Sequence, residues 1–190
     1  ETGIGGRLDS TNVVTPEVSV ITTISLEHTD MLGETYAEIA AEKAGIIKQG
    51  KPVVVGVKNL EALAVIQQTA AQQHAPIYTI SEHFYVENQK GAFFDYRGNI
   101  SIDKIELAMA GEHQKANAAL AITAADLFLS SFDAQKVKLA LQHAKWEGRF
   151  ERVRHNVILD GAHNSEGTTA LIKTLKDTAP KHKVKFVYAA

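Results

Sequence analysis

Short runs of apolar and β-branched residues recur along the first eighty positions of the chain. They occupy residues 18–26 (VSVITTISL), 53–57 and 77–80, and turn or helix signals bound each of them. Runs of this length and composition are typical of buried strands. The first strand is expected to end near Glu27.

The segments between these runs have helical spacing. Residues 36–47 carry Tyr, Ile, Ala, Lys and Ile on one stripe, after a capping-box pattern formed by Thr35 and Glu38. Residues 59–74 form an Ala- and Gln-rich helical segment. Strands that alternate with helices predict an α/β fold with a mainly parallel sheet.

The pattern changes after residue 84. Residues 84–105 alternate apolar and polar positions, with turn signals at 90–91 and 97–99, which predicts a small antiparallel patch. Two helices, at 112–129 and 134–144, are expected to follow.

A polar segment at residues 145–152 interrupts the chain, and a strand-helix-strand pattern then restarts. The expected elements are a strand at 156–160, a helix at 166–177 and a strand at 183–189. We interpret 145–152 as a domain junction.

Two domains follow from this junction. Residues 1–146 are expected to be part of a central ATPase-like domain, and 147–190 the start of a Rossmann-like α/β domain. Two parallel strands and one helix cannot cover both faces of a sheet, so the second domain is expected to be truncated. The first methionine is Met31, which also suggests a piece of a longer protein.

Composition narrows the function classes. The 190 residues are 45% hydrophobic and 22% charged, with a formal net charge of −2, so neither nucleic acid nor a membrane is an expected partner. No cysteine is present, which excludes disulfides and thiolate chemistry. Without a signal peptide or a long apolar segment, the expected location is the cytoplasm.

The chain opens on the glycine-rich stretch ETGIGGRLDSTN. Gly3, Gly5 and Gly6 do not have the dinucleotide-fingerprint spacing, and no predicted helix follows them, which disfavours a dehydrogenase. The stretch is either a loop that lets the backbone approach a ligand or a plain connection.

The sequence Glu27-His28-Thr29-Asp30 follows the first predicted strand directly. Open α/β sheets bind ligands beyond the carboxyl ends of their strands, so this position favours a functional site. The alternative is a hydrogen-bonded surface histidine.

Lys43 lies on the apolar stripe of its predicted helix, which should face the core. It either extends to the surface at the edge of the stripe or is an inward lysine whose pKa is lowered by burial. A neutral amine can react with carbon dioxide, and the resulting carbamate offers oxygen ligands to a hard cation.

The helix at 112–129 begins with polar residues, including His113 and Asn117, on the same stripe as later apolar positions. An asparagine on that buried face can present a donor and an acceptor to the edge of adenine. A helix-capping cluster is an equally open alternative.

Four more polar residues lie around the junction and the next strand end: Arg149, Asp160, His163 and Asn164. Arginine offers paired donors to phosphate, and a carboxylate can accept from ribose hydroxyls. His163 and Asn164 precede a predicted helix N-terminus. Together these groups suggest a nucleotide held between two domains.

Five blocks of the chain, taken in order, resemble the folate-linked branch of the Mur-type ATP-dependent amide ligases, the folylpolyglutamate and dihydrofolate synthases. The blocks are ETGIGGRLDSTN, ITTISLEHTDMLGETYAEIAAEKAGIIKQGKPVV, GEHQKANAALA, WEGRFE and DGAHN. The resemblance covers nearly the whole chain.

The resemblance implies a role for each matching position. Glu1 and His28 correspond to magnesium-binding positions and Lys43 to a carbamylated lysine, although histidine is not a hard ligand. It also implies catalytic roles for Lys43, His28 and Arg149.

The nucleotide-binding positions implied by the resemblance lie later in the chain. Asn117 matches an adenine-contacting asparagine with His113 beside it, Arg149 a phosphate-contacting arginine and Asp160 a ribose-contacting acid. His163 and Asn164 continue the same loop.

By the same resemblance, the whole protein is expected to add L-glutamate to folate or dihydropteroate through an acyl phosphate. ATP and Mg²⁺ are the implied cofactors, with K⁺ as a further candidate, and the family suggests a monomer. Glu147 replaces a usual proline, and the family's phosphate-binding loop of G-x-x-G-K-[ST] type is absent from these residues, so this chain is expected to be inactive alone.

Two alternatives remain open. One is a cell-wall precursor ligase of the same superfamily, which the block GIGGRLDSTN argues against. The other is a catalytically inactive nucleotide-binding or regulatory relative, against which Glu1, His28 and Lys43 weigh.

Overall fold

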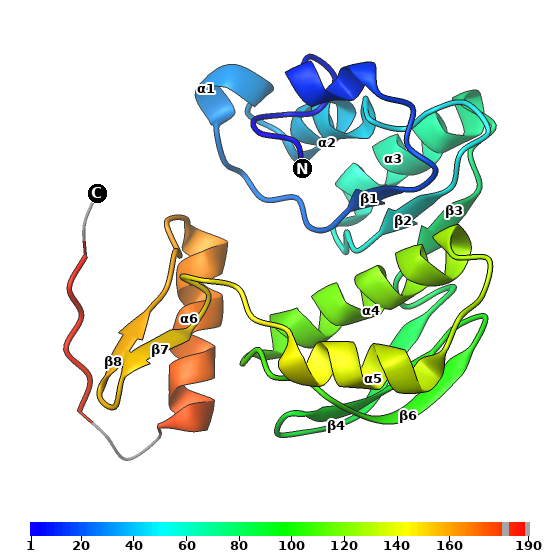
Figure 1. Cartoon of the computed structure of the whole chain (residues 1–190). Coiled ribbons are helices and arrows are strands. Elements are labelled where there is room, and N and C mark those ends of the chain that lie inside the picture. Colours follow the sequence, from blue (N-terminus) through cyan, green and yellow to red (C-terminus); the bar gives the residue numbers. More distant parts are fainter. Residues whose placement is uncertain (180–182, 189–190) are drawn as a thin grey trace.

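The first group of elements is a parallel sheet with helices beside it. The computed structural model describes residues 1–179 and 183–188, and Figure 1 shows their arrangement. Strands β1 (Ser19–Ile21), β2 (Val53–Val55) and β3 (Ile77–Thr79) pair in parallel, in the order β1-β2-β3. All three residues of β2 are fully buried, as expected for the central strand. The predicted parallel sheet is confirmed.

Two helices pack against this sheet, α2 (Tyr36–Ala44) and α3 (Leu60–Gln72). The capping box is present, because Glu38 N donates to Thr35 Oγ1 (3.2 Å) and Thr35 N donates to Glu38 Oε2 (3.0 Å). Asn59 caps α3 by accepting from Ala62 N (3.0 Å). These caps satisfy backbone donors that have no partner within their helices.

Several boundaries differ from the prediction. Strand β1 covers only part of the predicted 18–26, because the ladder of its one neighbour, β2, ends at Val55. Helix α2 stops at Ala44 rather than at residue 47. The short helices η1 (Ser10–Val13) and α1 (Thr29–Leu32) were not predicted, since single turns leave no periodic pattern.

The second group contains an antiparallel sheet and two helices. The sheet is formed by β4 (Tyr85–Lys90), β5 (Phe93–Arg97) and β6 (Ser101–Glu106), and the helices are α4 (Glu112–Phe128) and α5 (Ala134–His143). The core between α4 and this sheet includes Phe94, Tyr96, Ala119 and Ile122. The antiparallel patch and both helices are confirmed.

The end of β2 comes very close to α4. A Cβ added to Gly56 would lie 2.4 Å from the carbonyl oxygen of Thr22 and 2.8 Å from a methyl carbon of Leu120. Real side chains do not tolerate such distances, so only glycine lets the strand end and the helix meet here.

The third group contains β7 (Glu151–Arg154), β8 (Val157–Leu159) and α6 (Ser165–Thr178). Strands β7 and β8 form an antiparallel hairpin. Strand β7 was not predicted, because its sequence, Glu-Arg-Val-Arg, contains only one apolar residue. Its first two residues fall within the predicted junction at 145–152.

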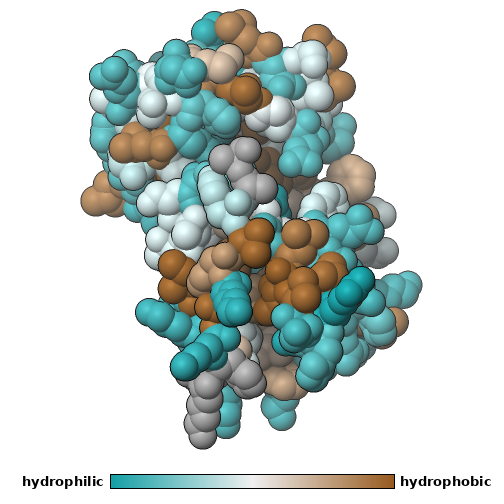
Figure 2. All heavy atoms as spheres, turned by 90° about the vertical axis from the view of Figure 1, so that its left-hand side faces the viewer, coloured by the Kyte–Doolittle hydropathy of each residue, from teal (hydrophilic) through white to brown (hydrophobic). Residues whose placement is uncertain are grey.

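The strand predicted at 183–189 is not observed in residues 183–188, and residue 189 lies outside the described part. The composition Val-Lys-Phe-Val-Tyr suits a strand, but a strand needs a hydrogen-bonded neighbour, and 183–188 pair with none. Figure 2 shows the face that includes this third group, where apolar side chains lie among charged ones. Val157, Leu159 and Phe186 are among the exposed apolar residues.

No helix in the part of the chain that the structure describes is long and apolar enough to span a bilayer.

The packing of α3 gives a test of the fold. Ile66 is fully buried, whereas Leu60 in the same helix is 81% exposed. Ile66→Ala should lower the free energy of unfolding by about 3 kcal/mol, because it leaves a cavity. Leu60→Ala should change it by less than about 0.5 kcal/mol. Urea denaturation followed by circular dichroism measures both, and equal effects would contradict the packing described.

Candidate nucleotide site between the central and C-terminal elements

A cavity of about 810 Å³ lies where the end of β1, helix α4 and the start of α6 meet. It brings together three of the predicted site residues, His113, Asn117 and Asn164. Asn117 is exposed at the cavity wall rather than buried, as the sequence had suggested, and its amide donates to Gln114 Oε1 (3.2 Å). Its side chain is therefore available to a ligand.

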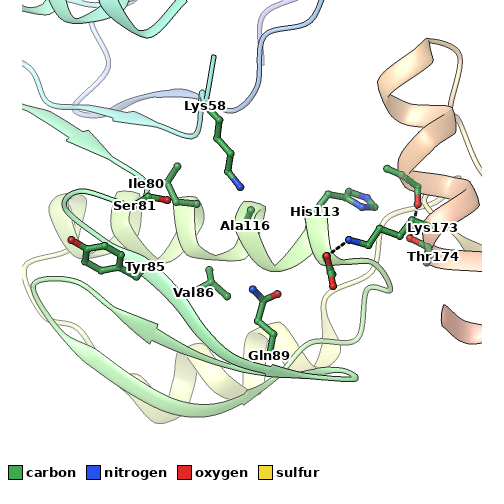
Figure 3. Close-up of a pocket in the computed structure, with 12 residues that line it drawn as sticks. Lys58, Ile80, Ser81, Tyr85, Val86, Gln89, His113, Ala116, Lys173 and Thr174 are labelled. Carbon is green, nitrogen blue, oxygen red and sulfur yellow. Dashed lines mark hydrogen bonds and ion pairs between the residues drawn. The ribbon is translucent and has the colours of Figure 1, made fainter. Parts of the chain in front are cut away.

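A smaller cavity of about 370 Å³ adjoins the first and is drawn in Figure 3. Side chains from β4, α4 and α6 surround it, together with Lys58 from the carboxyl end of β2. The residues that line both cavities are Lys58, His113, Ala116, Ala170 and Lys173. Because the two share this wall, one extended ligand can reach both.

Glu27 joins two predicted site residues. Its Oε2 accepts a hydrogen bond from Asn164 Nδ2 (2.8 Å), and its Oε1 lies 4.0 Å from Lys43 Nζ. The oxygen of the same Asn164 amide, Oδ1, accepts from Gly167 N (2.7 Å) and caps α6. One asparagine thus fixes the helix start and ties it to the end of β1.

A second polar contact joins α4 and α6. Lys173 Nζ donates to Glu112 Oε2 at the edge of the smaller cavity, as Figure 3 shows. This hydrogen bond, together with the opposite charge of Lys173, lowers the pKa of Glu112. The same partner raises the pKa of Lys173. Both side chains are therefore charged at neutral pH.

Asp160 is held by the backbone of its own hairpin and loop. Its carboxylate accepts from Phe150 N (2.8 Å) and from Ala162 N (2.9 Å). The Arg149 guanidinium lies close to the next residue, since a Cβ on Gly161 would be 2.8 Å from an Arg149 nitrogen. The Arg149 guanidinium therefore lies beside Gly161, the residue that follows Asp160.

The charges of Arg149 and Asp160 reach His113 on α4. Partial burial lowers the pKa of His113 most, Asp160 opposes this shift, and Arg149 adds to it. His113 is thus largely neutral at neutral pH, with ring nitrogens that can accept or donate a hydrogen bond. The predicted residues Arg149, Asp160 and His113 belong to one electrostatic environment.

The other predicted residues, Lys43, Arg149 and Asp160 included, line neither cavity. His163 is exposed, and its Nδ1 lies 2.9 Å from the carbonyl oxygen of Gly161. His28 is exposed at the start of α1 with a left-handed backbone (φ 51°), and Glu1 is exposed at the chain end.

The expected magnesium ligands, Glu1, His28 and a carbamylated Lys43, stay a prediction. Among residues 1–179 and 183–188, no three His, Asp or Glu side chains lie close enough together to hold a metal ion. Lys43 is not a ligand as an amine and becomes one only as a carbamate. A carbamate there would bring a second negative charge near Glu27, and a cation between the two would offset their repulsion.

Sequence reasoning missed several groups of this site. Glu27 was recognised only as part of a polar cluster after β1, and its contact with Asn164 joins residues 137 positions apart. Lys58, Glu112 and Lys173 were not singled out. The one available signal was the position of Lys58 directly after a buried strand, where parallel sheets bind ligands.

The Mur ligase middle domain family matches residues 2–125, which is most of the chain. The chain belongs to the Mur ligase family. A dihydrofolate synthase/folylpolyglutamate synthase of Bacillus subtilis (strain 168) is 39% identical to it over an alignment of 201 positions. The alignment covers 100% of this chain and 47% of that protein. The cell-wall branch of the superfamily is therefore not favoured.

Solved structures agree with this assignment. A Mycobacterium tuberculosis folylpolyglutamate synthase complexed with ADP superposes with a TM-score of 0.87 at 34% identity, over 92% of this chain and 42% of that one. An FPGS–AMPPCP–folate complex gives a TM-score of 0.87 at 35% identity, over 93% and 46%. The chain spans just under half the length of these relatives.

The tie between Glu27 and Asn164 can be tested without losing the helix cap. Asn164→Asp keeps a capping oxygen for α6 but removes the donor to Glu27 and places two carboxylates together. Amide hydrogen exchange in residues 22–27 and 164–170 should become faster.

Asn59→Asp is the matched control, because Asn59 also caps a helix but has no such second partner in the structure described. Its exchange rates should change little. Unaltered exchange in Asn164→Asp would mean that the tie does not hold α6 in place.

The charges around His113 lead to a second prediction, which concerns the pKa of its side chain. Arg149→Gln removes a positive charge and should raise the pKa of His113, whereas Arg152→Gln, whose guanidinium donates to the His155 carbonyl, should leave it unchanged. Titration of the His113 ring protons by NMR, assigned with His113→Gln, measures both shifts.

The lowered pKa of His113 also determines how the stability of the fold changes with pH. Because the pKa of His113 is lower folded than unfolded, the unfolded chain binds the proton first as pH falls. Stability should therefore decrease as pH falls from the ordinary histidine pKa toward the lowered one, and His113→Gln should remove part of this loss. A pKa of His113 that is the same in Arg149→Gln would contradict the proximity of the two residues.

Proposed function

We propose that this chain forms part of an ATP-dependent ligase that adds L-glutamate to folate, to dihydropteroate or to both. Residues 1–146 would be part of its central ATP-binding domain, and 147–190 the start of its C-terminal domain. The observation that carries this proposal is the cavity in which His113 and Asn117 from α4 face Asn164 before α6. Clefts between domains are preferred sites for nucleotides and other small ligands.

Each polar group near this cavity has a proposed role toward ATP. Asn117 would contact adenine, with His113 beside it, because an amide offers both a donor and an acceptor to the base edge. Asp160 would accept from the ribose hydroxyls, and Arg149 would contact phosphate. His163 and Asn164 would complete the loop on the nucleotide side.

These roles support an acyl-phosphate reaction. A substrate carboxylate attacks the γ-phosphorus of ATP and ADP leaves; the glutamate amine then attacks the acyl carbon, and phosphate leaves as the amide forms. The Arg149 guanidinium would offset the charge on the phosphates. The ties from Glu27 and Glu112 to α6 would hold the cavity closed against water, which hydrolyses acyl phosphates.

Magnesium and potassium belong to the proposal as cofactors of the whole enzyme. Glu1, His28 and a carbamylated Lys43 are the proposed magnesium ligands, with His28 and Lys43 acting near the reacting phosphate. The contact of Lys43 with Glu27 supports a cation at this position, because a carbamate on Lys43 would place two negative charges close together. A divalent cation would supply charge neutralisation on phosphate oxygens.

We further propose a monomeric, cytoplasmic enzyme whose partners are small molecules rather than nucleic acid or membranes. The net charge of −2 supports the absence of an electrostatic nucleic-acid surface. The competing proposal is a catalytically inactive, nucleotide-binding relative, which would bind ADP but not form amide bonds.

The test of the ligase is ATP-dependent incorporation of labelled L-glutamate by the whole enzyme that carries this chain. Dihydropteroate and a reduced folate monoglutamate serve as separate acceptors, with magnesium, potassium and bicarbonate present. Incorporation into either acceptor is expected, and the preferred acceptor names the activity. No incorporation, with ADP still bound, would favour the inactive relative.

Lys43→Ala in the same enzyme should remove most of the turnover and change the melting temperature little, because the ion pair of Lys43 with Glu27 is long (4.0 Å) and contributes little stability. Lys51→Ala is the control, since Lys51 pairs with Glu17 outside both cavities. Full activity in Lys43→Ala would show that this lysine has a structural role only.

A further inference from the structure

Lys58 occupies a position that the proposed mechanism does not use. It follows β2, the central strand of the parallel sheet, at the carboxyl end where such sheets bind ligands. Its side chain lines both cavities, and Figure 3 shows its amine directed toward the space beside Ala116 and His113. A ligand in either cavity would meet this amine.

Within the part of the chain that the structure describes, no carboxylate offsets the charge of Lys58. Lys173, the other lysine of the shared wall, is paired with Glu112, and Lys43 and Lys51 lie beside Glu27 and Glu17. Lys58 makes no ion pair or side-chain hydrogen bond with any described residue. His113 is largely neutral at neutral pH, so Lys58 is the net positive charge of the wall that both cavities share.

The backbone around Lys58 is held on both sides. Gly56 allows β2 to approach Leu120 of α4, and Gly56 N donates to the Ile21 carbonyl (2.8 Å). Asn59, the next residue, caps α3 through Ala62 N (3.0 Å). The lysine therefore projects from a rigid segment, which favours a defined binding geometry over a freely solvated chain.

We infer that Lys58 binds an anionic group of the ligand that occupies the two adjoining cavities. The inference rests on the proposed function and adds a binding residue to it. The anion is a phosphate of the nucleotide or a carboxylate of the acidic substrate, since an ammonium group donates equally to both. Lys58 is a binding residue, with no part in bond formation.

The experiment is a calorimetric titration of the whole enzyme that carries this chain with ADP, adenosine and L-glutamate as separate probes. Lys58→Met keeps the length and apolar stem of the side chain but removes its charge. If the anion is phosphate, the variant should bind ADP about tenfold more weakly and adenosine as before. If it is a carboxylate, the loss of affinity should appear with L-glutamate instead.

Two controls make the result specific. Lys58→Arg keeps the charge and should bind within about threefold of the original chain, because guanidinium also donates to anions. Lys51→Met removes a lysine at the opposite end of β2 and should bind normally. Circular dichroism should show the same melting temperature for all three variants, since Lys58 is exposed.

The outcomes separate this inference from the proposed function. Normal binding of ADP and L-glutamate by Lys58→Met overturns the role of Lys58 and leaves nucleotide binding intact. Equal losses for ADP and adenosine would place Lys58 at the base rather than at an anion, and also overturn it. Failure of the unaltered enzyme to bind ADP would overturn the proposed function, and with it the role of Lys58 that rests on it.

Discussion

The close packing of α4 against the end of β2 is the contact on which the rest of the structure depends. Gly56 has no side chain, so Leu120 can lie against the strand, and the opposite side of α4 packs on Phe94 and Tyr96 of the antiparallel sheet. One helix is thereby shared by two sheets. Its first two turns carry His113 and Asn117 to the cavity wall.

Much of the central fold was predictable because its signals are local. The capping box of α2, the Val-Val-Val run of β2 and the 17-residue α4 each follow from spacing and residue type within a short window. The errors fall where structure depends on a neighbour. Strand β1 ends with its partner's ladder, β7 forms only because β8 lies beside it, and residues 183–188 have strand composition without a partner strand.

The site was only partly predictable for the same reason. His113, Asn117 and Asn164 could be recognised by residue type and position at element ends, and the structure places them around one cavity. The contact of Glu27 with Asn164 joins distant parts of the chain, which no periodic pattern can indicate. The sequence alone could not single out Lys58. What distinguishes this lysine is that no carboxylate lies beside it in the structure described, and that depends on how the elements pack.

The contacts between α6 and the central elements differ in kind from those inside each group. Apolar side chains hold the two sheets to α4, whereas the side-chain bonds from α6 to the central elements, within the residues described, are Asn164 to Glu27 and Lys173 to Glu112. Dissolved ions screen the exposed Lys173–Glu112 ion pair but leave buried apolar contacts unaffected or strengthen them. Ionic strength therefore acts on the junction separately from the folded cores, and can loosen the cleft while each of its walls stays intact.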